Sequence, residues 1–307
     1  MFQLKNLGIK NFISNADIDR EKTHYLLELA NKFKNKELEI SLKNKVLGLI
    51  FDKASTRTRV SFQVAMSRIG GTTIDLNPST SQIGRGEPIR DTARVLSRYC
   101  DVLAIRTFKQ SVLEEYAEWS NKPVINALTD LEHPCQALAD FMTIKEEFGY
   151  LENLVLTYIG DGNNVSNSLM LCGSILGLEV RIATPKGFEP NAAIVDKANK
   201  MNNKDLIHIS NDPFEAVRGA NAIYTDVWSS MGQENDKEDK DKKFTEFTLN
   251  SDLLSKAPQN AIILHCLPAY REKEITDEVF ESKKSRIFEQ AENRMHAQQA
   301  LLYCLLS

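Results

Sequence analysis

The sequence has few cysteines, and they lack the spacing of a disulfide framework or a zinc site. There are five, an odd number, scattered over 307 residues as Cys100, Cys135, Cys172, Cys266 and Cys304. Disulfide-rich and zinc-binding proteins carry their cysteines in closely spaced pairs. We therefore expect no disulfide and no metal ion, and we expect the protein to act in the reducing cytoplasm.

The chain also lacks an excess of one charge, a long apolar run and a secretion signal. Its 38 basic and 42 acidic residues give a net charge of −4, without a block of like charge. Nucleic-acid binding needs a basic face, so no such partner is expected. No apolar run approaches the ~20 residues of a membrane span. The N-terminal MFQLKNLGIKNF lacks the apolar stretch of a signal peptide, and we expect no membrane association.

The composition shows no other extreme. Hydrophobic residues make up 42% and charged residues 26% of the chain, which excludes disordered and collagen-like proteins. At roughly 150 residues per domain, the length predicts two domains.

Short apolar runs alternate with helical patterns along the chain. In the first half, strands are predicted at 46–51, 102–106 and 123–126, and helices at 59–69, 88–100, 112–119 and 134–148. In the second half, strands are predicted at 154–160, 178–185, 206–210, 222–228 and 261–268. This alternation favours parallel strands joined by crossover helices. The predicted fold class is α/β, with two domains that each have a central parallel sheet flanked by helices.

The expected domain boundary lies at the GYLEN stretch, which separates a domain of residues 1–149 from one of residues 150–289. The last helical segment, 290–307, is expected to pack back on the first domain. The charged run Gln233–Lys243 has no apolar period. It is interpreted as a solvated loop, with part of a mobile lid as the alternative.

The most informative motif is STRTR at residues 55–59, where a predicted buried strand runs directly into a helix. Free backbone N–H groups and the helix dipole attract an anion to such a helix start. The hydroxyls and guanidiniums add donors and charge that suit a phosphate. Ser and Thr also serve as ordinary N-caps, but this density of donors favours a phosphate site. The chain has no G-x-x-x-x-G-K-[ST] motif, which excludes a nucleotide P-loop.

Further polar residues follow other predicted strands, at the edge where doubly wound sheets bind ligands. Arg106 ends one strand, and His133-Pro134-Cys135-Gln136 opens a helix after another. Gly160-x-Gly162 resembles a dinucleotide motif, but the third glycine and the following acidic residue are missing, so NAD binding is weakly supported. The asparagines after Gly162 suit a small polar ligand instead.

Two motifs of the second half remain ambiguous when each is taken alone. Asp226, with Ser230-Met231-Gly232 after it, either pairs with an ammonium group or is an ordinary turn residue. In HCLP at 265–268, Cys266 is either a reactive thiol facing the cleft or a buried packing residue.

Taken together, these motifs resemble the aspartate/ornithine carbamoyltransferase family. STRTR with Phe51-x-Lys53 and HPCQ are similar to its carbamoyl-phosphate site, and Asp226 with the SMG and HCLP motifs resembles the ornithine branch. Gln82 stands where aspartate enzymes use a lysine. The resemblance implies a homotrimer with active sites at subunit interfaces, no cofactor, and a role in arginine biosynthesis. It also assigns carbamoyl phosphate to the domain 1–149 and ornithine to the domain 150–289.

The resemblance further implies the residues of the site. Carbamoyl phosphate would be bound by Ser55, Thr56, Arg57, Thr58, Gln82, Arg106, His133, Pro134, Cys135, Gln136, Cys266, Leu267 and Arg294. Ornithine would be bound by Asn167, Asp226, Ser230 and Met231. The catalytic groups would be Arg57, Arg106, His133 and Cys266.

The chemistry of carbamoyl transfer fits these residue types. A neutral amine attacks a carbonyl carbon, and Arg57, Arg106 and His133 supply donors for the oxygen that gains charge. The leading hypothesis is transfer from carbamoyl phosphate to the δ-amine of L-ornithine, which gives L-citrulline and phosphate. Alternatives are aspartate, putrescine or an acetylated or succinylated ornithine as the acceptor, a non-catalytic carbamoyl-phosphate-binding protein, and, more remotely, a nicotinamide dehydrogenase.

Overall fold

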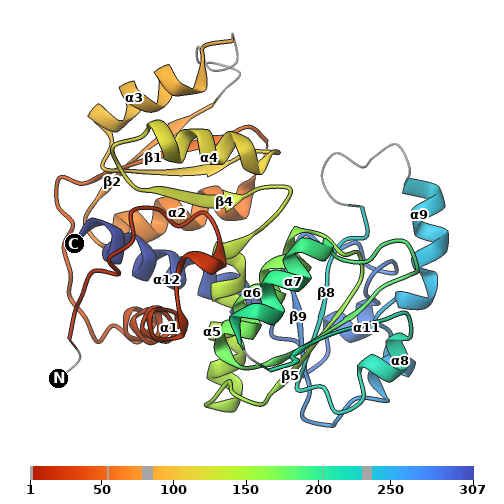
Figure 1. The fold of residues 1–307 in the computed structure, drawn as a ribbon. Coiled ribbons are helices and arrows are strands. Elements are labelled where there is room, and N and C mark those ends of the chain that lie inside the picture. Colours follow the sequence, from red (N-terminus) through yellow and green to blue (C-terminus); the bar gives the residue numbers. More distant parts are fainter. Residues whose placement is uncertain (1–2, 54, 78–85, 203, 230–236) are drawn as a thin grey trace. The chain divides into compact units, whose positions relative to one another are not determined.

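A computed structural model describes residues 3–53, 55–77, 86–202, 204–229 and 237–307. The chain forms two compact units (Figure 1). Unit 1 comprises Met1–Met142 and Asn293–Ser307, and unit 2 comprises Thr143–Glu292. Each unit contains one fully parallel sheet, as the alternating sequence pattern predicts.

The sheet of unit 1 has the strand order β2-β1-β3-β4. Its strands are β1 (Val46–Phe51), β2 (Thr72–Leu76), β3 (Val102–Arg106) and β4 (Val124–Leu128). The inner strands are apolar and buried because helices cover both faces of a parallel sheet. Strand β2 lies at an edge, and most of its residues are exposed.

Helices cover both faces of this sheet. The helices that belong wholly or partly to unit 1 are α1 (Arg20–Lys34), α2 (Thr56–Arg68), α3 (Ile89–Tyr99), α4 (Gln110–Trp119), α5 (Pro134–Phe148) and α12 (Ile287–Leu306), with a 3-10 turn η1 (Asn15–Asp17). In Figure 1, α3 and α4 lie on one side of the sheet and α2 on the other. Helix α12 is held in unit 1 by hydrogen bonds from Lys34 to Asn293 (2.8 Å) and from Asn6 to the Ser307 carbonyl (3.0 Å). The expected return of the C-terminal helix is confirmed.

The sheet of unit 2 has the strand order β7-β6-β5-β8-β9. Its strands are β5 (Val155–Ile159), β6 (Glu179–Ala183), β7 (Ile207–Ser210), β8 (Ala222–Thr225) and β9 (Ile262–His265). The other elements are α6 (Asn164–Leu176), α7 (Ala192–Met201), α8 (Pro213–Ala216), α9 (Lys237–Phe244), η5 (Thr245–Phe247), α10 (Ser251–Leu254) and α11 (Asp277–Phe280). Helices α6 and α7 pack side by side (Figure 1).

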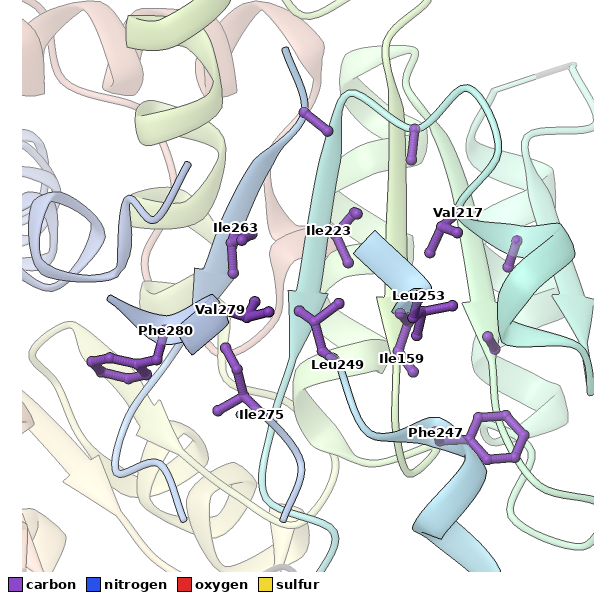
Figure 2. Packing of buried hydrophobic residues seen from close by; sticks show 14 of the residues in the cluster. Ile159, Val217, Ile223, Phe247, Leu249, Leu253, Ile263, Ile275, Val279 and Phe280 are labelled. Carbon is purple, nitrogen blue, oxygen red and sulfur yellow. The ribbon is translucent and has the colours of Figure 1, made fainter. Parts of the chain in front are cut away.

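A buried apolar cluster holds short helices against the sheet of unit 2. Figure 2 shows Ile223 of β8 and Ile263 of β9, which are paired neighbours in the sheet, with Leu253 of α10 and Val279 of α11 near them. All four side chains are buried. Their burial supplies much of the free energy that keeps these one-turn helices folded, because such short helices are not stable alone.

Two structural features differ from the sequence-based expectation. Sequence patterning missed α1 and β2 altogether. The charged run 233–243 is not wholly a loop, because Lys237–Phe244 forms helix α9. The two compact units divide inside α5 and α12, and the domain boundaries at 149/150 and 289/290 remain predictions. None of the described helices has the length and hydropathy needed to cross a bilayer.

Candidate active site

In each sheet, the order of the strands reverses at one position, and the candidate site residues follow the strands beside that position. In unit 1, the chain passes from β1 outward to β2 and then returns to β3 on the other side of β1. In unit 2, β5 occupies the same position between β6 and β8. Ligands of open α/β sheets bind at the carboxyl ends of the strands that flank such a point. Each unit therefore has one expected binding position.

In unit 1, this position holds the start of helix α2. Ser55 is the N-cap, with extended backbone, but its side chain makes no capping hydrogen bond within the described part of the chain. The first backbone N–H groups of α2 consequently keep their capacity to bind an anion. Thr56 is exposed, and Ser55 and Arg57 are half-buried.

Near the helix start lies a group of polar side chains that we call the cationic cluster: the buried Thr58, His133 and Arg294 and the half-buried Arg106. The Thr58 hydroxyl accepts hydrogen bonds from Nη1 of Arg106 (3.5 Å) and from Nη2 of Arg294. Arg294 lies on the C-terminal helix α12 and is almost fully buried. The structure thus gathers residues from α2, β3, the loop before α5 and the C-terminal helix.

The electrostatics of the cluster keep His133 neutral. Burial, and then the guanidiniums of Arg294 and Arg106, hold the pKa of the His133 imidazole well below its usual range. A neutral imidazole donates through one nitrogen only. His133 can therefore serve as a hydrogen-bond donor to a carbonyl oxygen without carrying a positive charge of its own.

Helix α5 begins at Pro134 and places the rest of the HPCQ motif. The Gln136 side chain is buried, and its Nε2 donates to Oδ1 of Asp140 (2.7 Å). The Cys135 thiol instead donates to the carbonyl of Asn126 in β4 (3.4 Å), and burial raises the pKa of Cys135 to about 12. Its side chain packs against the sheet, so a ligand-binding role for Cys135 can involve only its backbone.

In unit 2, a second group of side chains lies beyond β5, β8 and β9. We call Asn163, Asp226 and Cys266 the carboxylate cluster. The Cys266 thiol donates to Oδ1 of Asp226 (3.0 Å), and Nδ2 of Asn163 donates to Oδ2 (2.9 Å). Oδ1 of Asn163 caps α6 by accepting from the N–H groups of Val165 and Ser166. The cap fixes the orientation of the Asn163 amide, and its NH₂ therefore faces Asp226.

His265 braces the segment that carries Cys266 and Leu267. Its Nδ1 accepts from the Leu267 N–H (2.8 Å), and its Nε2 lies 3.2 Å from Oε1 of the buried Glu274. Ligand atoms of Asp226, His265 and Cys266 lie within 4.8 Å of one another, close enough for a metal ion. Both nitrogens of His265 already have partners, so a metal ion there would have to displace one of them.

A buried ion pair ties α9 to the loop after β5. Lys240 Nζ lies 2.6 Å from Oδ2 of Asp161, and both side chains are less than 10% exposed. The Lys240 ammonium also lies over the rings of Phe188 and Phe244. Burial raises the pKa of Asp161 even though the Lys240 ammonium opposes it. The expectation that this charged run is solvated is wrong for Lys240.

Of the remaining residues that were expected to bind a ligand, the structure describes some and leaves others undescribed. Asn167 is buried on the first turns of α6, and Leu267 has a positive φ of 60°. Gln82, Ser230 and Met231 lie outside the described residues. Sequence reasoning overlooked Asp140 and Tyr158, whose hydroxyl donates to Asn163 (3.3 Å). Asn163 was expected only as one of several asparagines suited to a polar ligand, although Asn directly before a helix is also a typical N-cap.

Comparison with known proteins gives the same result for both halves of the chain. The family model for the aspartate/ornithine carbamoyltransferase carbamoyl-P binding domain matches residues 10–146, and that for the Asp/Orn binding domain matches residues 152–305. An ornithine carbamoyltransferase of Prochlorococcus marinus subsp. pastoris is 70% identical to this chain over 307 residues, and the match covers 100% of each chain.

Solved structures agree at the level of the whole fold. The ornithine carbamoyltransferase of Gloeobacter violaceus is 50% identical with a TM-score of 0.90, over 97% of this chain and 99% of that one. The enzyme from Pyrococcus furiosus is 43% identical with a TM-score of 0.94, over 99% of each chain. The chain therefore belongs to the aspartate/ornithine carbamoyltransferase family.

Proposed function

We propose that this protein transfers the carbamoyl group of carbamoyl phosphate to the δ-amine of L-ornithine, giving L-citrulline and phosphate. One observation carries the assignment. The cationic cluster of unit 1 and the carboxylate cluster of unit 2 lie beside the winding reversals of their sheets, within a chain 70% identical to an ornithine carbamoyltransferase. A carbamoyl donor needs buried cations, whereas an amino acid acceptor needs a carboxylate.

The phosphate group is bound at the start of α2. The free N–H groups there, the hydroxyls of Ser55, Thr56 and Thr58, and the Arg57 guanidinium supply donors and positive charge. The same contacts stabilise the phosphate dianion that leaves when the bond between carbonyl carbon and phosphate oxygen breaks. Binding and leaving-group stabilisation thus use one set of groups.

The carbamoyl group is oriented and activated by the rest of unit 1. Arg106 and the neutral His133 donate to the carbonyl oxygen, which gains negative charge as the amine nitrogen forms its bond to carbon. Oε1 of Gln136 accepts from the carbamoyl NH₂, which fixes the plane of the group for attack. The tetrahedral adduct then expels phosphate.

The acceptor is bound by the carboxylate cluster and must lose a proton. A δ-ammonium with a pKa of about 10.4 leaves on the order of 1 molecule in 10³ neutral at pH 7. Asp226 binds an ammonium group of ornithine. Cys266 binds the δ-amine and takes up its proton while the thiol proton passes to Oδ1 of Asp226, to which the thiol is hydrogen-bonded. Asn167 and the segment with Ser230 and Met231 would hold the amino acid end.

We further propose a homotrimer whose active sites include Gln82 of a neighbouring subunit. Strand β2, which leads towards Gln82 in the sequence, is an open sheet edge, with Ile74 43% exposed and Val60 of α2 50% exposed. An open edge with exposed apolar side chains suits a contact with a second copy. Sedimentation at micromolar concentration should give about three times the chain mass, and Ile74→Glu should lower it.

The setting we propose is arginine biosynthesis in the cytoplasm. All five cysteines are free thiols in the structure, which suits a reducing compartment. The domain assignment also remains part of this proposal, with carbamoyl phosphate bound by the first domain and ornithine by the second.

Citrulline formation from carbamoyl phosphate tests the proposal directly. L-ornithine should be the preferred acceptor, and putrescine should be poor because it lacks the α-carboxylate. Aspartate, N-acetylornithine and N-succinylornithine complete the acceptor panel. A protein that binds carbamoyl phosphate in calorimetry but turns over with none of these acceptors would be a non-catalytic homologue, and the proposal would be wrong.

A further inference from the structure

The Gln136 amide is buried with only one end satisfied. Its Nε2 donates to Oδ1 of Asp140 at 2.7 Å, and Gln136 and Asp140 are 1% and 0% exposed. Oε1 of Gln136 is also buried and has no partner among the residues that the structure describes. A buried acceptor without a partner costs about 1–3 kcal/mol. Its persistence indicates that a donor arrives at this oxygen when the site is filled.

Asp140 determines which end of the amide meets that donor. The two residues lie four apart on α5, one helical turn from each other, so their side chains meet on one face. An ionised carboxylate accepts hydrogen bonds and cannot donate one. The NH₂ of Gln136 must then point to Asp140, and the carbonyl oxygen must point away from it. Without this constraint, either end of the amide fits the same space.

We propose that Asp140 is a positioning residue that makes the site select a carbamoyl donor over an acetyl donor. This inference rests on the proposed function. Carbamoyl phosphate and acetyl phosphate have nearly the same shape, but only the former has an NH₂ that can donate to Oε1 of Gln136. The methyl group of acetyl phosphate would leave that buried oxygen unpaired. Sites built to hydrogen-bond one substrate group reject analogues that lack it far more strongly than apolar pockets do.

The test compares Asp140→Asn with the unchanged chain. Asparagine has almost the same volume but can donate as well as accept, so Gln136 is free to turn its NH₂ outward. We expect kcat/KM for carbamoyl phosphate to fall about 10–100-fold, with the KM of ornithine unchanged. The inhibition constant of acetyl phosphate, used as a competitor, should change less than threefold, so that the discrimination between the two donors shrinks. Asp140→Ser carries the same expectation and replaces Asp140→Asn if that variant does not fold.

A double-mutant cycle separates positioning from a general structural role. In a Gln136→Ala background, Asp140→Asn should cause almost no further loss, because its effect passes through Gln136. Additive losses, or equal losses for carbamoyl and acetyl phosphate, would overturn the inference. Asp101→Asn, at the amino end of β3, is the matched control and should keep wild-type discrimination. If the unchanged chain forms no citrulline at all, the proposed function fails, and that result is distinct from a failure of this inference.

Discussion

The two clusters differ in how their polar atoms are satisfied. Unit 1 contains groups with spare hydrogen-bonding capacity: the first backbone N–H groups of α2, and Oε1 of Gln136, which has no partner among the described residues. In unit 2, both oxygens of Asp226 already accept hydrogen bonds from Asn163 and Cys266. The site for the carbamoyl donor is thus preorganised for its ligand. Ornithine, in contrast, must compete with Asn163 and Cys266 for the oxygens of Asp226. Loss of a group should therefore affect substrate binding more in unit 1 and proton transfer more in unit 2.

The largest effect is expected in unit 1, from Arg57→Ala. Removing this guanidinium from the start of α2 takes away charge that both binds the phosphate and stabilises it as it leaves. We expect kcat/KM for carbamoyl phosphate to fall by about 10³-fold or more, whereas the KM of ornithine should stay unchanged. Steady-state kinetics in both substrates measure this. Arg68→Ala, at the exposed far end of α2, is the control. A loss confined to the KM of ornithine would reverse the assignment of the two units.

The next effect tests whether the second unit depends on its buried ion pair. Lys240→Met leaves Asp161 without its counter-ion in a dry environment, which typically destabilises a protein by about 3–5 kcal/mol. Adding Asp161→Asn removes the stranded charge and should recover most of that loss. Urea unfolding of the single and double variants measures the difference. Equal destabilisation in both would mean that Lys240 acts through its packing on Phe188 and Phe244 alone.

Lys240 also shows where sequence patterns stop being informative. Apolar strands and helices with clear end signals were predictable: β3 and α5 have the expected bounds, because β3 is a run of buried apolar residues and Gly149 closes α5 with a φ of 80°. The polar edge strand β2 and the charged helix α9 lack such patterns. A single buried lysine in a charged run cannot be recognised without the carboxylate that it meets 79 residues away.

The residues of the candidate site also differ in whether the sequence could indicate them. Thr58 and Arg106 could be proposed from sequence motifs, and Arg294 from the family resemblance; the structure brings these three into contact. Asp140 could not be, since its importance depends on which end of a neighbouring amide it fixes. Helical spacing from Gln136 was visible, but buried carboxylates on helices usually serve packing or capping roles.

A moderate effect on catalysis is expected in unit 2, and it tests whether this unit contributes mainly to proton transfer. Cys266→Ser replaces the thiol that donates to Asp226 with a weaker acid. We expect kcat to fall about 10–100-fold and its pH optimum to move, because proton removal from the amine is impaired. The KM of carbamoyl phosphate should stay within about twofold if the effect is confined to this step. Cys304→Ser, which changes a buried thiol of α12, is the control. An unchanged kcat and pH optimum would exclude a role for Cys266 in proton transfer.

The smallest effect concerns the pH dependence of folding in unit 1. The folded-state pKa of His133 lies well below 6.5, whereas the unfolded chain takes up a proton near pH 6.5. Protons then favour the unfolded state, so stability is lost as pH falls below 6.5, by about 1.4 kcal/mol per pH unit at most from this residue. His133→Asn should reduce the drop in unfolding free energy between pH 7 and pH 5.5 by about 1 kcal/mol. A drop equal to that of the unchanged chain would mean that folding does not lower the pKa of His133, and the carbonyl oxygen would then face an imidazole that becomes a cation below pH 6.5.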